Sequence, residues 1–263
     1  THAVRMGAPI IPLFIYDVHG HDTRKLGGAS QWWLHHSLNA LQTSLKACGS
    51  DLVIRTGKAF EVLQQLVSET GASSVMWNRE YTPEAVKRDT HIKAHLGVPC
   101  HSTRGSVLFE PMEIRTGGDA PYRVFTPYYR ACLANLAVTG ACLPAPAALP
   151  APGTWPASAP LAAPVLLSRI AWDGHFKDLW QPGEAGARAR ATHFLDTGLH
   201  DYKDARDRPD RDGTSRLSPA LHFGEISPRM LWYAANDKKA AAPQLTTGAD
   251  NFVRELVWRE FSI

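Results

Sequence analysis

The chain of 263 residues has 44% hydrophobic and 20% charged side chains, which is ordinary for a soluble globular protein, and its length allows two domains with cores of their own. It has no apolar run of membrane-spanning length. The formal net charge of +3 excludes a general excess of positive charge, so any nucleic-acid surface must be a local patch.

Short apolar runs that predict strands alternate with longer helical patterns in the first hundred residues. The strands are expected at Ile10–Tyr16, Asp51–Arg55 and Val75–Asn78, and the helices at Gln31–Cys48, Ala59–Thr70 and Pro83–Leu96. Strands that alternate with helices of this length predict parallel βαβ units and a doubly wound, Rossmann-like sheet. Because the sequence has no Gly-x-Gly-x-x-Gly loop, we do not expect this domain to bind a dinucleotide.

The middle of the chain changes composition. Residues Pro144 to Pro164 are mostly alanine and proline, which predicts an extended surface linker, and helical character returns near Gly183. We therefore predict an α/β domain at residues 1–135, an interdomain linker at 136–182 and a helical domain at 183–263. The four cysteines show no metal-ligand spacing and indicate reduced thiols in a cytoplasmic protein.

Two Ser-Pro pairs, Ser218-Pro219 and Ser227-Pro228, each predict a helix start, with serine as the N-cap and proline at the first helical position. Gly224 between them predicts a helix stop. The hydroxyls and the cation of Thr214-Ser215-Arg216 precede the first start, an arrangement that suits a phosphate group. On spacing alone, a phosphate site and two capped surface helices are equally good interpretations.

These runs carry a family resemblance. The stretch from Thr214 to Arg229 resembles the flavin-phosphate signature of the photolyase/cryptochrome family, and Glu255–Phe261 resembles the family's next helix, which faces the flavin and the DNA lesion. Gly27–Trp33 and Asn78–Tyr81 resemble stretches of its N-terminal antenna domain. Tyr122–Arg130 resembles the segment that leads into the interdomain connection, and we assign it a structural role. The chain is most similar to bacterial class I-type cyclobutane pyrimidine dimer photolyases.

The resemblance implies an α/β antenna domain followed by an all-α FAD-binding domain. It implies a deoxyribodipyrimidine photo-lyase, a carbon–carbon lyase in which excited, reduced FAD passes an electron to a dimer flipped out of UV-damaged DNA. The enzyme is expected to be a cytoplasmic monomer without membrane contact. A second antenna chromophore, a deazaflavin or a folate, is implied, and Glu84-Ala85 departs from the asparagine-glutamate pair of folate binders. A cryptochrome-type flavin photoreceptor and a (6-4) photoproduct photolyase are the alternatives.

The resemblance also implies roles for single residues, and it implies no metal ligand. Those expected to hold the flavin are Tyr202, Thr214, Ser215, Arg216, Leu217 and Ser218. Arg206 is expected to meet the DNA backbone. Glu255 and Trp258 lie three residues apart on one helix face and are implied to contact the dimer, which makes them the catalytic candidates, with Arg259 as a further DNA contact. A plainer interpretation of that helix is an exposed Glu255–Arg259 ion pair and a core tryptophan at position 258.

The family's opening strand and the second half of its helical domain have no counterpart in this sequence. We therefore expect a fragment that is inactive by itself. In an incomplete helical domain, apolar surface is expected to be exposed around Leu221, Phe223, Leu231, Phe252 and Phe261, and the fragment is expected to hold flavin poorly.

Overall fold

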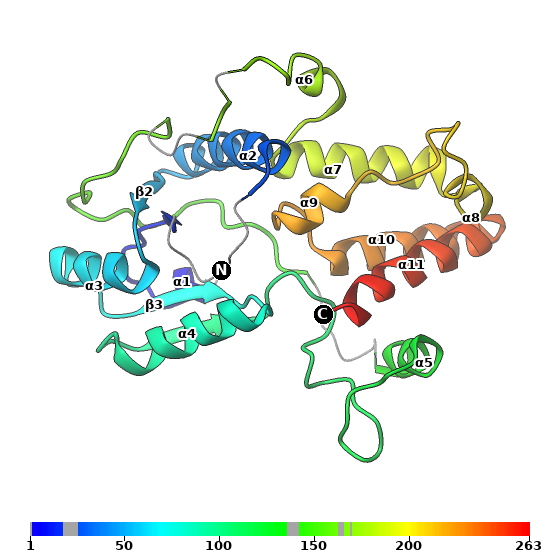
Figure 1. Cartoon of the computed structure of the whole chain (residues 1–263), viewed down its shortest axis with the longest axis horizontal. Helices are drawn as coiled ribbons and strands as arrows, with labels where there is room; N and C mark the ends of the chain where they lie inside the picture. Colours follow the sequence, from blue (N-terminus) through cyan, green and yellow to red (C-terminus); the bar gives the residue numbers. More distant parts are fainter. Residues whose placement is uncertain (1, 18–25, 136–141, 163–165, 169) are drawn as a thin grey trace. The chain divides into compact units, whose positions relative to one another are not determined.

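The computed structural model describes residues 2–17, 26–135, 142–162, 166–168 and 170–263. The chain divides into two compact units (Figure 1). We call them the α/β unit, Thr1–Thr103 with Leu143–Gly183, and the helical unit, Arg104–Cys142 with Glu184–Ile263. Among the described helices, none combines the length and the apolar character needed to cross a bilayer.

The α/β unit contains two pairs of parallel strands and the helices that connect them. Its elements are α1 (His2–Arg5), β1 (Leu13–Tyr16), α2 (Gly28–Ala47), β2 (Val53–Thr56), α3 (Ala59–Thr70), β3 (Val75–Asn78), α4 (Pro83–His95), β4 (Cys100–Thr103) and α6 (Phe176–Leu179). Strand β1 pairs with β2, and β3 pairs with β4. The parallel βαβ units are thus confirmed, and α3 and β3 have the predicted bounds. Strand β4 was missed because its sequence, Cys-His-Ser-Thr, lacks an apolar run.

The side chains of β1 alternate between two apolar clusters, as the pleat of a strand requires. Phe14 and Tyr16 pack in a cluster with residues of α2, whereas Leu13 and Ile15 pack in another cluster with residues of α3 and α4. Helices therefore cover both faces of the strands, as in a doubly wound sheet. Trp32 of α2 is buried in this unit, with only 4% of the residue exposed.

The alanine- and proline-rich segment is part of the α/β unit. The backbone N–H of Leu149 donates to the carbonyl of Cys48, and that of Ala159 donates to Ile54. Ser158 Oγ accepts from the N–H of Ile54 at 2.9 Å, and Leu166 is buried in the cluster of α2 and β2. This division differs from the predicted linker at 136–182, of which residues 136–141, 163–165 and 169 lie outside the described part. The reason is that an extended segment without a core of its own can still complete the hydrogen bonds of another unit.

The helical unit gathers two distant parts of the chain around one core. Its elements are α5 (Phe125–Asn135), α7 (Glu184–His193), the π-helix η2 (Phe194–Gly198), α8 (Tyr202–Ala205), α9 (Ser218–His222), α10 (Pro228–Ala241), the 3₁₀ turn η3 (Pro243–Leu245) and α11 (Thr246–Phe261). Helix α11 lies beside α10 and also contacts α5 and α8 (Figure 1). Residues 104–135, predicted to end the first domain, therefore pack with the C-terminal helices.

The expected exposure is wrong for Leu221, Leu231 and Phe252, whereas Phe223 and Phe261 are partly buried. Leu221 is 7% exposed, Leu231 1% and Phe252 3%, and all three belong to the core of the helical unit. The prediction failed because it counted partners along the sequence, whereas α5 and the segment before it supply partners from a distant part of the chain. Burial of side chains of this size stabilises the unit by about 1.5–3 kcal/mol each.

The two Ser-Pro pairs differ in the structure. Ser227 is the N-cap of α10, and its Oγ accepts a hydrogen bond from the N–H of Arg229 at 3.2 Å, as predicted. Ser218 lies at the first position of α9 and makes no capping bond, so its predicted role as a cap is wrong. The helix thus starts one residue earlier than predicted, and Arg216, two residues before it, adopts a left-handed conformation with φ of 53°. Gly224 follows α9 with φ of 72° and is the predicted stop.

These caps predict a difference in stability. Replacement of Ser227 with alanine leaves a backbone N–H of α10 without its acceptor and is expected to lower the free energy of unfolding by about 1 kcal/mol. The matched change Ser218→Ala removes an exposed hydroxyl with no capping bond and is expected to have little effect. Urea denaturation of both variants measures the difference, and equal losses would contradict the assignment of the caps.

Candidate functional site

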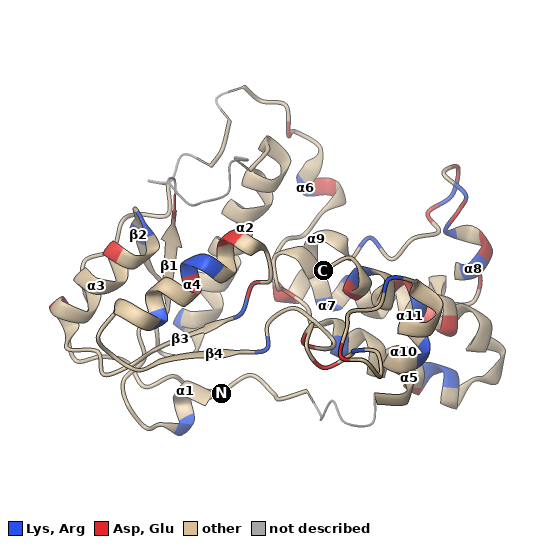
Figure 2. Cartoon of the chain, turned by 60° about the horizontal axis from the view of Figure 1, so that its bottom comes forward, with Lys and Arg blue, Asp and Glu red and all other residues tan. Residues whose placement is uncertain are grey.

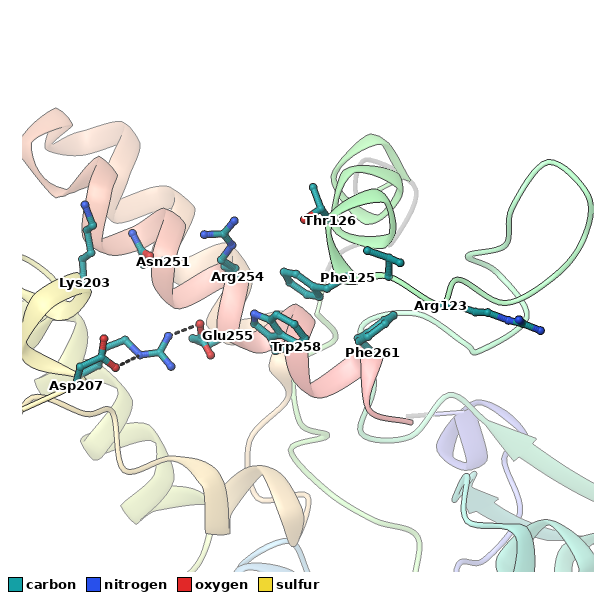
Figure 3. Close-up of a pocket in the computed structure, with 12 residues that line it drawn as sticks. Arg123, Phe125, Thr126, Lys203, Asp207, Asn251, Arg254, Glu255, Trp258 and Phe261 are labelled. Atoms are coloured by element: carbon teal, nitrogen blue, oxygen red, sulfur yellow. Dashed lines mark ion pairs between the residues drawn. The ribbon is translucent and has the colours of Figure 1, made fainter. Parts of the chain in front are cut away.

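A pocket of about 820 Å³ lies in the helical unit, between α11, α8 and the start of α5 (Figure 3). It is lined by Arg123, Val124, Phe125, Thr126, Lys203, Arg206, Asp207, Asn251, Arg254, Glu255, Trp258 and Phe261. The lining includes four cationic side chains and two carboxylates, so the pocket carries an excess of positive charge. Figure 2 shows that charges of both signs follow each other along α8 and the loop after it.

Helix α11 supplies this pocket because its apolar and polar residues separate onto two faces. Phe252, Val253, Leu256 and Val257 are buried in the core of the helical unit. The residues that face the pocket recur at helical spacing, namely Asn251, Arg254, Glu255 and Trp258. The prediction that Glu255 and Trp258 share one helix face is confirmed (Figure 3).

Glu255 forms an ion pair with Arg206 of the segment that follows α8 (Figure 3). Their side chains are 28% and 30% exposed, so the pair is partly shielded from water. The hydrogen bond to Glu255 raises the pKa of Arg206. The alternative ion pair between Glu255 and Arg259 is therefore wrong. The structure brings Glu255 to a cation 49 positions away, a contact that helical spacing could not reveal.

Trp258 is 41% exposed, so it is not a core tryptophan. One face of its indole lies against the ring of Phe125 from α5, with the ring centroids 3.6 Å apart and the planes 7° from parallel (Figure 3). An exposed aromatic ring in a positively charged pocket is a suitable platform for a flat, anionic ligand such as a nucleotide.

Tyr202 belongs to the core of the helical unit and is not among the residues that line the pocket. Its side chain is 7% exposed, and its ring makes edge contacts with Phe194 and Phe252. Burial raises the pKa of the Tyr202 phenol. The guanidinium of Arg206, one turn further along, lies 5.7 Å from the Tyr202 ring centroid. Tyr202 thus connects the pocket wall to the core.

The predicted phosphate segment lies outside the pocket lining. Arg190 of α7 holds its backbone, because the guanidinium donates to the carbonyls of Thr214 and Ser215 at 3.0 and 2.9 Å. Asp212 accepts from Arg216 Nε at 2.9 Å and lies 3.6 Å from Arg190.

The side chains of this segment face different ways. The side chains of Thr214, Arg216 and Ser218 are exposed, whereas Leu217 is buried in the core at 1% exposure. Ser215 Oγ accepts from the N–H of Leu217 at 3.4 Å. The turn therefore offers exposed hydroxyl donors. It also carries a net positive charge, because Arg190 and Arg216 are balanced by only one carboxylate, that of Asp212.

Arg259 also lies outside the pocket lining. It donates to the carbonyl of Ser106 at 2.6 Å and to Glu260 at 3.0 Å. Glu260 itself is 6% exposed, and its other oxygen accepts from the backbone N–H groups of Leu108 at 2.7 Å and Phe109 at 3.4 Å. The two residues therefore fasten α11 to the segment that precedes α5.

The chain was compared with known proteins. A protein-family model described as DNA photolyase matches residues 1–152. The chain belongs to the DNA photolyase family. The deoxyribodipyrimidine photo-lyase of Agrobacterium fabrum is 41% identical to it, over 98% of this chain and 54% of that protein. Cryptochrome-2 of Arabidopsis thaliana is 32% identical, over 96% of this chain and 44% of that protein.

A solved structure supports the same assignment. The crystal structure of a bacterial class III photolyase from Agrobacterium tumefaciens is similar with a TM-score of 0.87 and 39% identity, over 99% of this chain and 54% of that one. The family and the fold predicted from the sequence are thus confirmed. The class III description of this structure differs from the class I type that the sequence suggested. The chain spans about half the length of these relatives.

The sequence of this DNA photolyase family member did not reveal every pocket residue. Lys203, Asn251 and Arg254 were missed, although the spacing of Asn251 and Arg254 from Glu255 and Trp258 places all four on one helix face. Phe125 was given only a structural role. No local signal shows that it reaches Trp258, because the two residues are brought together by the packing of α5 on α11.

Glu260 generates a prediction about pH. Loss of water around this carboxyl outweighs its hydrogen bonds and raises its pKa from 4.5 to about 7. Because the folded state holds the proton more tightly than the unfolded state, this group favours folding most strongly below pH 4.5, and that contribution is lost as the pH rises through 7.

Glu260→Gln resembles the protonated form and is expected to remove this dependence, on the order of 3 kcal/mol between pH 4.5 and pH 8. The measurement is the free energy of unfolding of both proteins across this range. Parallel pH profiles for the parent and the variant would show that Glu260 titrates normally.

Proposed function

We propose that this protein takes part in the light-driven repair of cyclobutane pyrimidine dimers in DNA, as a deoxyribodipyrimidine photo-lyase that uses reduced FAD. The observation that supports this function best is the pocket, in which one helix presents an exposed tryptophan and a carboxylate beside several cations. Membership of the DNA photolyase family and the relatives named photo-lyase support it further. The chain spans about half the length of these relatives.

Different pocket residues are suited to contact different parts of a flipped-out dimer. The exposed face of Trp258 offers a surface on which the bases can stack, and stacking of this kind contributes about 1–3 kcal/mol per base. The carboxylate of Glu255 can accept a hydrogen bond from the N–H edge of a base, which places the dimer relative to the helix. Arg206, Lys203 and Arg254 supply positive charge for the phosphates that flank the lesion. A dimer already disturbs stacking and pairing, so its extrusion costs less than that of normal bases.

The turn at residues 214–218 fits the phosphates of FAD. Its exposed hydroxyls, Thr214 and Ser218, can donate to phosphate oxygens, and Arg190 and Arg216 exceed the charge of Asp212. Leu217 anchors the turn in the core rather than contacting the ligand. Tyr202, buried between the pocket wall and the core, is proposed as a further contact. FAD bound here would supply the photoexcited electron for dimer cleavage, while the protein residues bind and orient both partners.

A cryptochrome-type photoreceptor is the alternative, and the 32% identity to Cryptochrome-2 of Arabidopsis thaliana supports it. A photoreceptor does not need a carboxylate and an exposed tryptophan placed for a DNA lesion. Light-dependent loss of dimers from irradiated DNA separates the two functions. Repair of (6-4) photoproducts instead of dimers in the same assay would show that the lesion class is different.

Replacement of Glu255 tests the lesion-facing role. Glu255→Ala is expected to weaken dimer binding by about 1–3 kcal/mol, because base donors lose their acceptor, while the flavin absorption stays the same. Affinity for undamaged DNA should be retained or rise, because Arg206 is released from its ion pair. The measurements are dimer affinity and repair yield per absorbed photon. Asp250→Ala, which removes an exposed carboxylate from the same helix outside the pocket, is the matched control.

Replacement of Arg206 should act differently from that of Glu255. Arg206→Ala removes a cation and leaves the Glu255 carboxylate facing the DNA phosphates, so binding of damaged and undamaged DNA should fall together. The salt dependence of binding should decrease by about one phosphate contact. Arg208→Ala is the control, because Arg208 forms an exposed ion pair with Asp210 and lies outside the pocket lining. An unchanged salt slope in Arg206→Ala would refute the phosphate contact.

A further inference from the structure

The segment Tyr122–Arg130, which resembles a connection between domains, forms one wall of the pocket. Arg123, Val124, Phe125 and Thr126 line it, although they lie at least 120 positions before α11 in the chain. Phe125 differs from the other three because it is buried, at 7% exposure, while Val124 is 62% exposed. Its ring therefore belongs both to the core and to the pocket wall (Figure 3).

Phe125 stacks on one face of the Trp258 indole. A separation of 3.6 Å between nearly parallel rings is van der Waals contact and leaves no space for water. Two further rings fix the position of Phe125. Phe261 stands edge-on to it at 5.8 Å, and Tyr129, one turn along α5, lies 5.7 Å away with its plane 19° from parallel.

The packing of Phe125 and Phe261 restricts the orientation of the Trp258 indole. Phe261 also stands edge-on to Trp258 at 5.8 Å, so the indole is held on one face by Phe125 and at another side by Phe261. What stays accessible, 41% of the residue, belongs to the pocket. An exposed side chain that must be ordered when a ligand binds loses conformational entropy, and a side chain that is already ordered avoids this cost.

We propose that Phe125 is a positioning residue for substrate recognition, which holds the Trp258 ring in the plane on which a flipped pyrimidine dimer stacks. This role rests on the proposed function and assigns to it a residue from the first half of the chain. Phe125 acts through Trp258 and does not itself touch the substrate.

A double-mutant cycle on the purified protein tests the role. The readout is affinity for a single-stranded oligonucleotide with one thymine dimer, relative to the same oligonucleotide without it. Phe125→Leu is expected to reduce this preference about three- to tenfold, since Trp258 must then be ordered on binding. In the Trp258→Ala background, Phe125→Leu should cause no further reduction, because the effect passes through the indole. Phe125→Tyr keeps a flat ring and should restore most of the preference.

Three comparisons separate positioning from support of the fold. Phe109→Leu removes another buried ring of the same core without a ring contact to Trp258, and it should leave the dimer preference unchanged at a similar loss of thermal stability. Phe125→Met fills the volume without a flat face and gives the same test if Phe125→Leu does not fold. A preference that survives both Phe125 changes, or a loss that persists in the Trp258→Ala background, would overturn the role.

The outcome for the parent protein distinguishes this role from the proposed function. If the parent prefers the dimer and Phe125→Leu keeps that preference, only the role of Phe125 is refuted. If the parent shows no preference for the dimer, the proposed function fails, and the role of Phe125 fails with it.

Discussion

The division of α11 into a buried face and a pocket face is the constraint on which the rest of the site depends. A helix is rigid over four turns, so burial of Phe252, Leu256 and Val257 fixes the direction in which Glu255 and Trp258 point. The core thereby provides precision that exposed side chains could not achieve by themselves. Loss of core packing would move both pocket residues at once, even though neither of them belongs to the core.

The buried carboxylate of Glu260 extends this constraint to a distant segment. It accepts hydrogen bonds from the backbone N–H groups of Leu108 and Phe109, and Arg259 beside it donates a hydrogen bond to the carbonyl of Ser106. These bonds satisfy polar backbone groups in an apolar environment, where each unpaired group would cost about 1–3 kcal/mol. The segment they hold leads into α5 and hence to Phe125. The C-terminal end of α11 is therefore hydrogen-bonded to the segment that leads to the opposite wall of the pocket.

The pocket and the turn at residues 214–218 are built by different means. The pocket depends on contacts between segments far apart in sequence, such as Arg206 with Glu255 and Phe125 with Trp258. The turn depends mainly on local features, namely the left-handed conformation of Arg216 and the burial of Leu217, with Arg190 of α7 as a support from outside. This difference explains why the turn could be predicted from its sequence motif, whereas many of the pocket residues could not.

The sequence alone determined the family through the resemblance of its motifs, and its local patterns predicted the parallel βαβ units and the helix face shared by Glu255 and Trp258. Only the tertiary structure decided the partners of these elements. It joined residues 104–135 to the C-terminal helices, attached the alanine- and proline-rich segment to the α/β unit, and paired Glu255 with Arg206 rather than with Arg259. Periodicity reports which face of a helix is apolar, but it carries no information about which distant segment covers that face. That choice depends on the packing of the whole core, and here it made Phe125 part of the site.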